Sequence, residues 1–120
     1  DSYEKTHPFR LRKIAKRYPE LPIIAIHMGG VAFHDLTAAM IEVAQDCSNI
    51  TLVGSGVRAV NILTAIKTLG ADRVCFGSDT PFAMMHVEVA MYEALMRDAV
   101  SAEEQTLVMG GNIARLFGLD

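Results

Sequence analysis

Residues 73–82 read Arg-Val-Cys-Phe-Gly-Ser-Asp-Thr-Pro-Phe, a short apolar run that leads directly into a polar, turn-forming segment. The run at 73–76 is too short for a helix and has no polar alternation, which is typical of a strand buried on both faces of a parallel sheet. The glycine, serine, aspartate and proline that follow favour tight turns. This stretch therefore predicts a buried strand whose carboxyl end carries one ionisable residue, Asp79.

Two earlier segments repeat this pattern of an apolar run followed by a glycine-containing turn. The run at 23–26 (Ile-Ile-Ala-Ile) leads into His27-Met28-Gly29-Gly30, and the run at 50–53 (Ile-Thr-Leu-Val) leads into Gly54-Ser55-Gly56. In parallel α/β folds the loops at the carboxyl ends of the strands converge, and ligands bind there. We therefore expect His27 and Asp79 to lie close together at one edge of the sheet.

The segments around these runs have helical periodicity. Their apolar residues recur at three-four spacing in four stripes, which are Leu11, Ile14, Ala15, Tyr18; Phe33, Leu36, Met40, Val43; Ala59, Leu63, Ile66, Leu69; and Val87, Met91, Ala94, Leu95. Strands that alternate with helices imply right-handed crossovers and a parallel sheet, so the fold class is α/β. Because a sheet of three doubly buried strands needs neighbours at both edges, we expect a part of a larger fold or one protomer of a close assembly.

The last twenty residues predict two further helices. Residues 101–104 (Ser-Ala-Glu-Glu) form a capping box, which opens a helix. Gly110 and Gly111 are expected to end that helix, and Asn112 to cap a short final helix that Gly118 closes.

Bulk composition excludes several classes of function. The chain has 120 residues, 51% of them apolar and 21% charged, with a net charge of −3. This charge is too weak and of the wrong sign for a nucleic-acid or anionic-membrane binder, and no apolar run approaches the ~20 residues of a membrane span. The two cysteines, Cys47 and Cys75, lack ligand spacing, so we expect reduced, packed thiols and a cytoplasmic location.

Four segments together resemble a known family. They are residues 18–30 (YPELPIIAIHMGG), residues 49–56 (NITLVGSG), residues 70–82 (GADRVCFGSDTPF) and residues 112–119 (NIARLFGL). In this order they resemble the sixth, seventh and eighth strands and the closing helix of the amidohydrolase-related family, which includes aminocarboxymuconate semialdehyde decarboxylase. The resemblance implies that residues 1–120 are a single partial domain, the C-terminal portion of a (β/α)8 TIM barrel. Its content would be three parallel strands alternating with helices, plus C-terminal helices.

The resemblance also implies roles for the two strand-end residues. The eighth-strand aspartate of the family binds a divalent metal or sits against the metal-bound water, and it acts as a general base or proton shuttle, which assigns these metal-binding and catalytic roles to Asp79. The sixth-strand histidine polarises the substrate or transfers a proton, which assigns that catalytic role to His27. Zinc is the first expectation for the metal and manganese the second. The family's His-x-His pair and fifth-strand histidine have no counterpart in this sequence, so we expect an incomplete metal site. We also expect association with the missing N-terminal half or with a second copy.

Three more residues are candidates for substrate binding. Ser55 and Arg58 follow the second strand, and His34 follows the double glycine, although a turn serine, a solvated arginine and a loop histidine are the plainer interpretations. The function we expect is metal-assisted hydrolysis of a small-molecule ester, lactone or amide. The alternatives are non-oxidative decarboxylation of an aromatic or enoic acid on the same scaffold, and an incomplete fragment that only assembles. A stand-alone flavodoxin-like domain would need a longer glycine-rich phosphate loop than residues 54–56 provide.

Overall fold

Three short strands form the centre of the computed structural model, which describes residues 2–31 and 33–119. These strands are β1 (Ile23–Ala25), β2 (Ile50–Val53) and β3 (Val74–Cys75), and they form a parallel sheet in that order. In register, Ala25 lies beside Leu52, and Leu52 lies beside Val74. Each connection between strands passes through a helix, so the α/β architecture predicted from the sequence is confirmed.

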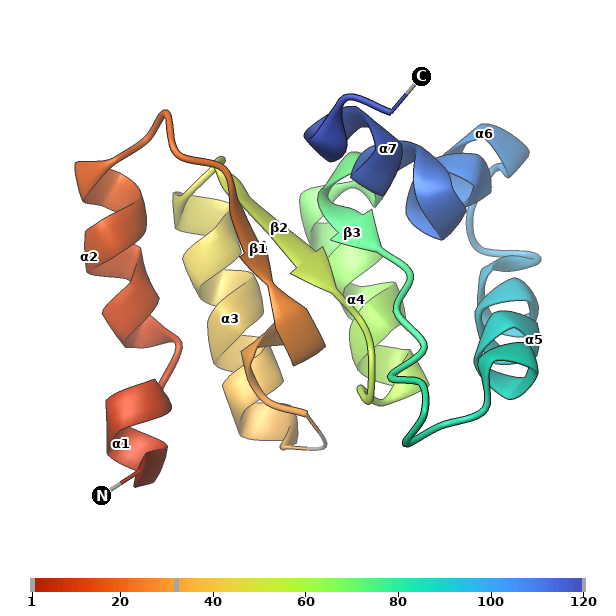
Figure 1. Ribbon diagram of the computed structural model, residues 1–120, viewed down its shortest axis with the longest axis horizontal. Coiled ribbons are helices and arrows are strands. Elements are labelled where there is room, and N and C mark those ends of the chain that lie inside the picture. Colours follow the sequence, from red (N-terminus) through yellow and green to blue (C-terminus); the bar gives the residue numbers. More distant parts are fainter. Residues whose placement is uncertain (1, 32, 120) are drawn as a thin grey trace.

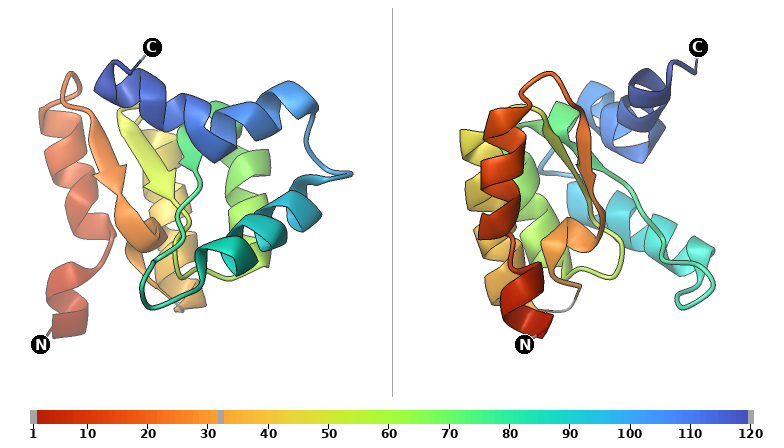
Figure 2. Two further views of the ribbon diagram at one scale, coloured as in Figure 1. Left: turned by 45° about the vertical axis from the view of Figure 1, so that its right-hand side comes forward. Right: turned by 60° about the vertical axis from the view of Figure 1, so that its left-hand side comes forward.

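In the described residues, seven α-helices pack beside and at one end of the strands (Figure 1). In chain order they are α1 (Ser2–Thr6), α2 (Phe9–Arg17), α3 (His34–Asp46), α4 (Ala59–Leu69), α5 (Met85–Met96), α6 (Ala102–Thr106) and α7 (Asn112–Phe117). Helices α2, α3 and α4 lie side by side along the sheet, while α6 and α7 lie near the amino end of β3 (Figures 1 and 2). The carboxyl ends of all three strands therefore point toward the opposite edge of the molecule, where the loops after β1, β2 and β3 gather.

The core lies between the strands and helices α3 and α4. Ile50, Leu52 and Val74 are fully buried, and they belong to one cluster with Val43 of α3 and Ile62 of α4. Burying each such aliphatic side chain contributes about 1.5–3 kcal/mol. Branched residues that favour extended backbone therefore also hold the helices against the sheet.

The strands are shorter than the apolar runs that predict them. Arg73 belongs to a 3-10 turn, η2 (Ala71–Arg73), and the Phe76 N–H donates to the Val108 carbonyl at 2.8 Å instead of extending the ladder. Ile26 begins a second 3-10 turn, η1 (Ile26–Gly29), and is 54% exposed. The prediction that 23–26 and 73–76 are buried strands throughout was therefore wrong at their ends, where the backbone turns into the loops.

Two of the predicted helical stripes differ from the buried faces. Phe33 precedes α3 and is 62% exposed, although Leu36 on the same predicted stripe is buried. In α5 the buried residues are Tyr92 and Met96, whereas Val87 is exposed. Apolar residues occur on several sides of α5, so periodicity alone does not identify the face that packs.

The C-terminal helices confirm two predicted end signals. The Ser101 hydroxyl accepts a hydrogen bond from the Glu104 amide at 3.2 Å, and the Glu104 carboxylate accepts one from the Ser101 amide at 3.0 Å, which completes the capping box. Gly118 adopts a left-handed conformation with φ 63° and ends α7. The ends of these helices were therefore visible in the sequence because they are built from local contacts.

The predicted break at Gly110 and Gly111 was wrong. Both residues lie in a π-helical turn, η3 (Leu107–Gly111), which runs directly into α7. Asn112 does not cap α7; its side chain is buried and donates to the carbonyls of Ala71 at 2.6 Å and Val74 at 2.9 Å. These long-range bonds attach the helix to β3 and outweigh the low helix propensity of two glycines.

Both cysteines are free and buried, so the predicted packed thiols are confirmed. None of the helices in the described part of the chain has the length and apolar character of a membrane span.

Candidate functional site

His27 lies in the turn directly after β1, where the backbone is left-handed (φ 56° at His27 and 46° at Met28). Its ring nitrogen Nδ1 is 2.7 Å from the backbone carbonyl oxygen of Ser55. A carbonyl oxygen only accepts hydrogen bonds, so a contact this short requires a proton on Nδ1. The neutral ring is thereby assigned to the tautomer whose Nε2 carries a free lone pair.

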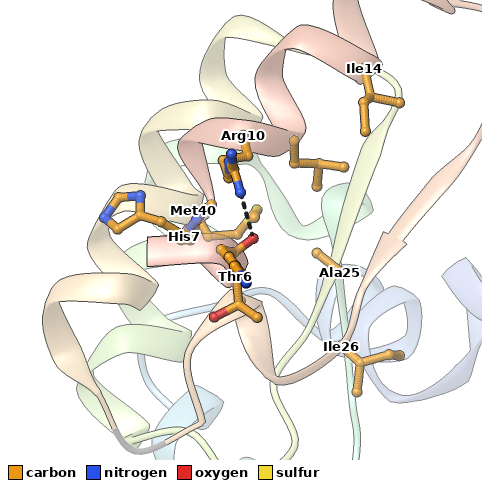
Figure 3. Close-up of a pocket in the computed structure, with 11 residues that line it drawn as sticks. Thr6, His7, Arg10, Ile14, Ala25, Ile26 and Met40 are labelled. Atoms are coloured by element: carbon orange, nitrogen blue, oxygen red, sulfur yellow. Dashed lines mark hydrogen bonds between the residues drawn. The ribbon is translucent and has the colours of Figure 1, made fainter. Parts of the chain in front are cut away.

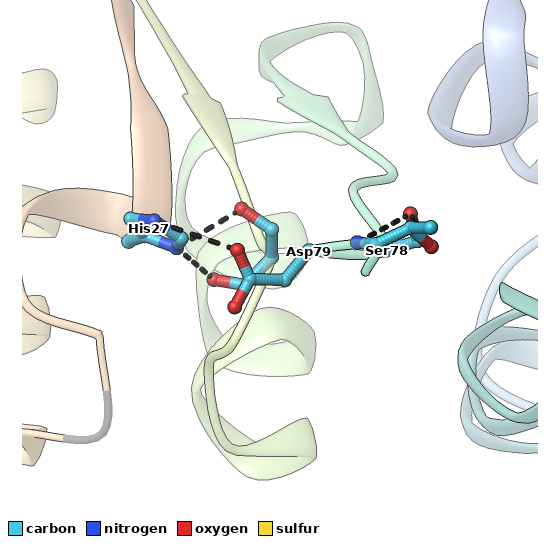
Figure 4. A network of polar contacts seen from close by, with 5 residues as sticks. His27, Ser78 and Asp79 are labelled. Carbon is cyan, nitrogen blue, oxygen red and sulfur yellow. Dashed lines mark hydrogen bonds and ion pairs between the residues drawn. The ribbon is translucent and has the colours of Figure 1, made fainter. Parts of the chain in front are cut away.

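Asp79 occupies the matching position after β3 and faces the other side of the same ring. Its Oδ1 lies 3.8 Å from His27 Nε2, and both side chains are 29% exposed. Figure 4 shows the two side chains pointing toward one another from different strand ends. The structure therefore places these two candidate residues together, at an edge where solvent or a ligand reaches both.

Ser55 contributes to this site by contact with His27. It is 5% exposed, and its hydroxyl lies 3.1 Å from His27 Nδ1 in addition to the carbonyl contact. A residue so buried, with both oxygens directed at the ring, orients the imidazole. In this structure the substrate-binding candidate Ser55 is thus placed behind the ring, where it fixes the ring's position.

Gly56 keeps the space beside the pair open. A Cβ atom at this position would lie 3.4 Å from Asp79 Oδ2 and 3.4 Å from His27 Nδ1. The residue also has φ 64°, a conformation that glycine adopts without steric cost. Both features explain why glycine follows Ser55.

The loop that carries Asp79 is held by its own polar residues. The hydroxyls of Ser78 and Thr80 lie 3.0 Å apart, and the Thr80 amide donates to Ser78 Oγ at 3.3 Å. The Asp79 carbonyl accepts from the Phe82 amide at 2.8 Å. Ser78 therefore stabilises the turn on one side of Asp79, which leaves the carboxylate free to face His27 (Figure 4).

The other two substrate-binding candidates stand apart from this pair. His34, at the start of α3, is hydrogen-bonded through Nδ1 to the Asn61 side chain of α4 at 2.7 Å. Arg58 precedes α4 and is exposed. Within residues 2–31 and 33–119, no hydrogen bond or ion pair joins either of them to His27 or Asp79.

Asn61 was not predicted as part of this region. It is 4% exposed and lies on a face of α4 whose neighbours are apolar. A buried polar residue within an apolar stripe needs a hydrogen-bond partner. The predicted apolar stripe of this helix did not include Asn61, so its burial is visible only in the structure, where its partner is His34.

Cys75 is unsuited to act as a nucleophile. It lies in β3, four residues before Asp79, and is 2% exposed. Burial raises the pKa of its thiol, and the charge of Arg115 lowers it by less. A thiol that stays neutral and buried is inert, which is consistent with a packing role.

Metal ligands are too few in the described residues to form a closed site. No group of three or more His, Cys, Asp and Glu side chains occurs there with the geometry to hold an ion. Catalytic zinc normally takes three protein ligands. Asp79 supplies one carboxylate at the right edge of the sheet, so this part of the chain fits a metal only as one contributor to a larger ligand set.

A separate apolar cleft runs along the open edge of β1 (Figure 3). Its volume is about 390 Å³, and it lies between the first two helices and β1. The lining residues include Leu11, Ile14, Ala25, Ile26 and Met40. Neither His27 nor Asp79 lines it, so the polar pair and this cleft are distinct features.

Parallel strands that alternate with helices, with an imidazole and a carboxylate at their carboxyl ends, are an arrangement known from (β/α) barrel folds. The chain belongs to the amidohydrolase family, whose model matches residues 2–119. The resemblance stated from the sequence motifs is thereby confirmed. Among functionally curated proteins, no sequence matches the chain.

Solved structures of related enzymes share this fold. An amidohydrolase from Burkholderia multivorans with bound zinc is 22% identical and superposes with a TM-score of 0.76, covering 95% of this chain and 50% of that one. A dihydroxybenzoic acid decarboxylase from Polaromonas sp. JS666, with bound manganese and the inhibitor 2-nitroresorcinol, is 25% identical with a TM-score of 0.70, covering 94% and 39%. A 2,6-dihydroxybenzoate decarboxylase in complex with 2,6-dihydroxybenzoate is 23% identical with a TM-score of 0.71, covering 95% and 40%.

The chain thus spans half or less of the length of these structures. The predicted fold, the C-terminal portion of a (β/α)8 barrel, is confirmed.

Proposed function

We propose that this chain carries the proton-transfer part of the active site of a metal-dependent enzyme that hydrolyses a small-molecule ester, lactone or amide. One observation carries the proposal. The Ser55 carbonyl holds His27 by Nδ1 at 2.7 Å, which directs Nε2 toward Asp79, 3.8 Å away at the same edge of the sheet. A fixed imidazole beside a carboxylate at the carboxyl ends of barrel strands is an arrangement suited to general acid–base chemistry.

The two side chains have complementary tasks in this proposal. His27 Nε2 has a free lone pair in the neutral ring, so it accepts a proton, and as an imidazolium it donates one to a substrate oxygen or leaving group. The Asp79 carboxylate stabilises the imidazolium while it is ionised, and it accepts the proton of an attacking water as the imidazolium gives its own proton to the leaving group. Ser55 keeps the ring oriented throughout, because its carbonyl contacts only the opposite nitrogen.

A divalent cation is part of the proposal, with zinc as the first choice and manganese as the second. The support is the zinc and manganese bound in related structures, together with the position of Asp79. When bound, the cation would polarise the substrate. Its further ligands would come from outside the described residues, supplied by an N-terminal half or by association with another copy.

The second candidate is non-oxidative decarboxylation of an aromatic or enoic acid. It is favoured by the decarboxylases among the related structures. In that reaction the bond to the carboxylate breaks, CO2 leaves, and the carbon takes a proton, which His27 is placed to deliver. A third possibility is an incomplete fragment that assembles without catalysis.

The test compares metal content and activity of the full-length protein with those of Asp79→Asn and His27→Gln variants. A panel of lactones, esters and amides is set against aromatic carboxylates, with CO2 release as the readout for decarboxylation. Each variant is expected to lose about 10²–10⁴-fold in kcat/KM, the usual contribution of a general acid or base. The matched controls are the exposed residues Asp98 and His86, as Asp98→Asn and His86→Gln.

Unchanged activity in Asp79→Asn would refute the assigned site. CO2 release from an aromatic acid, without turnover of any lactone, ester or amide, would replace hydrolysis by decarboxylation. Inactivity of the unmodified, metal-loaded protein on every substrate class would favour the assembly role.

A further inference from the structure

Tyr92 of α5 is a fully buried tyrosine whose hydroxyl makes no well-formed hydrogen bond with any of the described residues, 2–31 and 33–119. Its ring packs edge-to-face against Phe76, with the ring centroids 4.9 Å apart. That packing requires only an aromatic ring, which phenylalanine also has. A buried hydroxyl without a full partner destabilises a fold, so its presence indicates another role.

The hydroxyl lies against two glycines on neighbouring strand ends. At Gly54, a Cβ atom would collide with the Tyr92 oxygen, so glycine is required there by the phenol itself. Burial raises the pKa of the phenol, and the backbone of Gly77, which faces the same oxygen, lowers it by less. The Gly54 amide also donates to the Cys75 carbonyl at 3.1 Å, which joins the two strand ends beneath the hydroxyl.

Both glycines lie within two residues of the groups that surround His27. Gly54 precedes Ser55, whose carbonyl holds the His27 ring, and Gly77 precedes Asp79 by two residues. The backbones are closely packed here, since a Cβ at Gly77 would lie 2.8 Å from Ser55 Cβ. A shift of Gly54 or Gly77 is therefore transmitted directly to both partners of the imidazole.

We propose that Tyr92 is a positioning residue. Its hydroxyl packs against the backbone of Gly54 and Gly77, and this contact fixes the positions of the Ser55 carbonyl and of Asp79 relative to His27. The proposal deepens the proposed function and rests on the roles given there to His27 and Asp79. Tyr92 itself is fully buried, and within residues 2–31 and 33–119 no hydrogen bond or ion pair joins it to His27 or Asp79.

The first test is Tyr92→Phe, with the ring tautomer of His27 measured by nitrogen-15 NMR at a pH where the ring is neutral. Without the Tyr92 hydroxyl, the Ser55 carbonyl is expected to lose its short contact with His27 Nδ1. The ratio of the Nδ1–H to the Nε2–H tautomer then falls about fivefold, which corresponds to ~1 kcal/mol. Tyr18→Phe is the matched control, because Tyr18 directly follows α2 and is 45% exposed. An unchanged tautomer ratio in Tyr92→Phe would overturn the proposal.

The second test uses steric complementation and does not depend on one variant. Gly54→Ala alone places a methyl group against the Tyr92 hydroxyl, so it is expected to lower the tautomer ratio and the melting temperature. In the double variant Gly54→Ala, Tyr92→Phe the clash is gone, and the next atom near the methyl is Ile62 Cγ1 at 3.0 Å. Both properties should therefore recover at least partly toward those of the unmodified chain.

Gly110→Ala is the control for this pair, since a methyl there meets no atom within 4 Å. If Gly54→Ala lowered the tautomer ratio and the melting temperature equally in the otherwise unmodified chain and in the Tyr92→Phe variant, the proposed contact between the Tyr92 hydroxyl and Gly54 would be refuted. The NMR readout is independent of turnover, so the two proposals fail separately. Loss of the tautomer response removes the role of Tyr92, whereas full activity in Asp79→Asn removes the proposed function.

Discussion

The substitution Gly56→Ala tests whether the space beside His27 and Asp79 is used. Gly56 has φ 64°, and a non-glycine residue in this left-handed region costs about 1–2 kcal/mol. The new methyl would lie 3.4 Å from Asp79 Oδ2 and from His27 Nδ1, which is an ordinary contact distance. The variant is thus expected to fold with roughly 1 kcal/mol lower unfolding free energy, a drop in melting temperature of about 4–8 °C.

The functional effect of Gly56→Ala should exceed this loss of stability. The methyl occupies the space beside the pair and excludes water or substrate from that side of both groups, so we expect kcat/KM of the full-length protein to fall at least about tenfold. Stability is measured by thermal unfolding and activity under conditions where both proteins are folded.

Gly118→Ala is the matched control for this substitution. Gly118 has φ 63°, and a Cβ there meets no atom within 4 Å, so the same backbone strain is introduced at the end of α7. The two variants should lose similar stability, but only Gly56→Ala should lose activity. Equal activity in both would show that the space next to the pair has no role in catalysis.

Three further predictions concern stability. Arg73→Ala should lower the unfolding free energy, measured by urea denaturation, by about 3 kcal/mol. The reason is that the Arg73 guanidinium donates to the carbonyls of Ile50 at 2.7 Å and of Ala44 and Cys47 at 3.0 Å. Arg73→Lys should restore part of this loss. Burial raises the pKa of Tyr92, so above pH ~10 the unfolded chain releases a proton that the folded chain keeps. Stability should then fall with rising pH by up to ~1.4 kcal/mol per pH unit, and by less in Tyr92→Phe. Ser101→Ala should lower the melting temperature by removing the capping box, a loss of about 1 kcal/mol.

The sequence predicted the parts of the fold that depend on local chemistry. Apolar runs marked the three strands, and a capping box at Ser101 and a glycine at 118 marked helix ends. His27 and Asp79 were found because parallel strands bring their carboxyl ends to one edge, a rule of topology that needs no side-chain detail.

The parts that the sequence did not predict depend on contacts between distant segments. The helix through Gly110 and Gly111 persists because the Asn112 side chain donates to carbonyls about forty residues earlier, and no local propensity reports such a bond. The burial of Tyr92 likewise depends on the strand ends that pack against α5. Ser55 was expected as a substrate contact, but its orientation toward His27 is fixed by the register between β1 and β2.

Backbone strain provides independent support for the location of the site. Across residues 2–31 and 33–119, the non-glycine residues with positive φ are His27, Met28, Val31 and Asp79. All four lie in the segments that follow β1 and β3, and each costs of order 1 kcal/mol or more. Such strain persists only where the surrounding structure holds it, here through the contacts of His27 with Ser55 and the hydrogen bond to the Asp79 carbonyl. Strained residues cluster at functional sites, and here they lie at the same strand ends that bear the imidazole and the carboxylate. The left-handed backbone and the two ionisable groups thus occur at the same edge of the sheet.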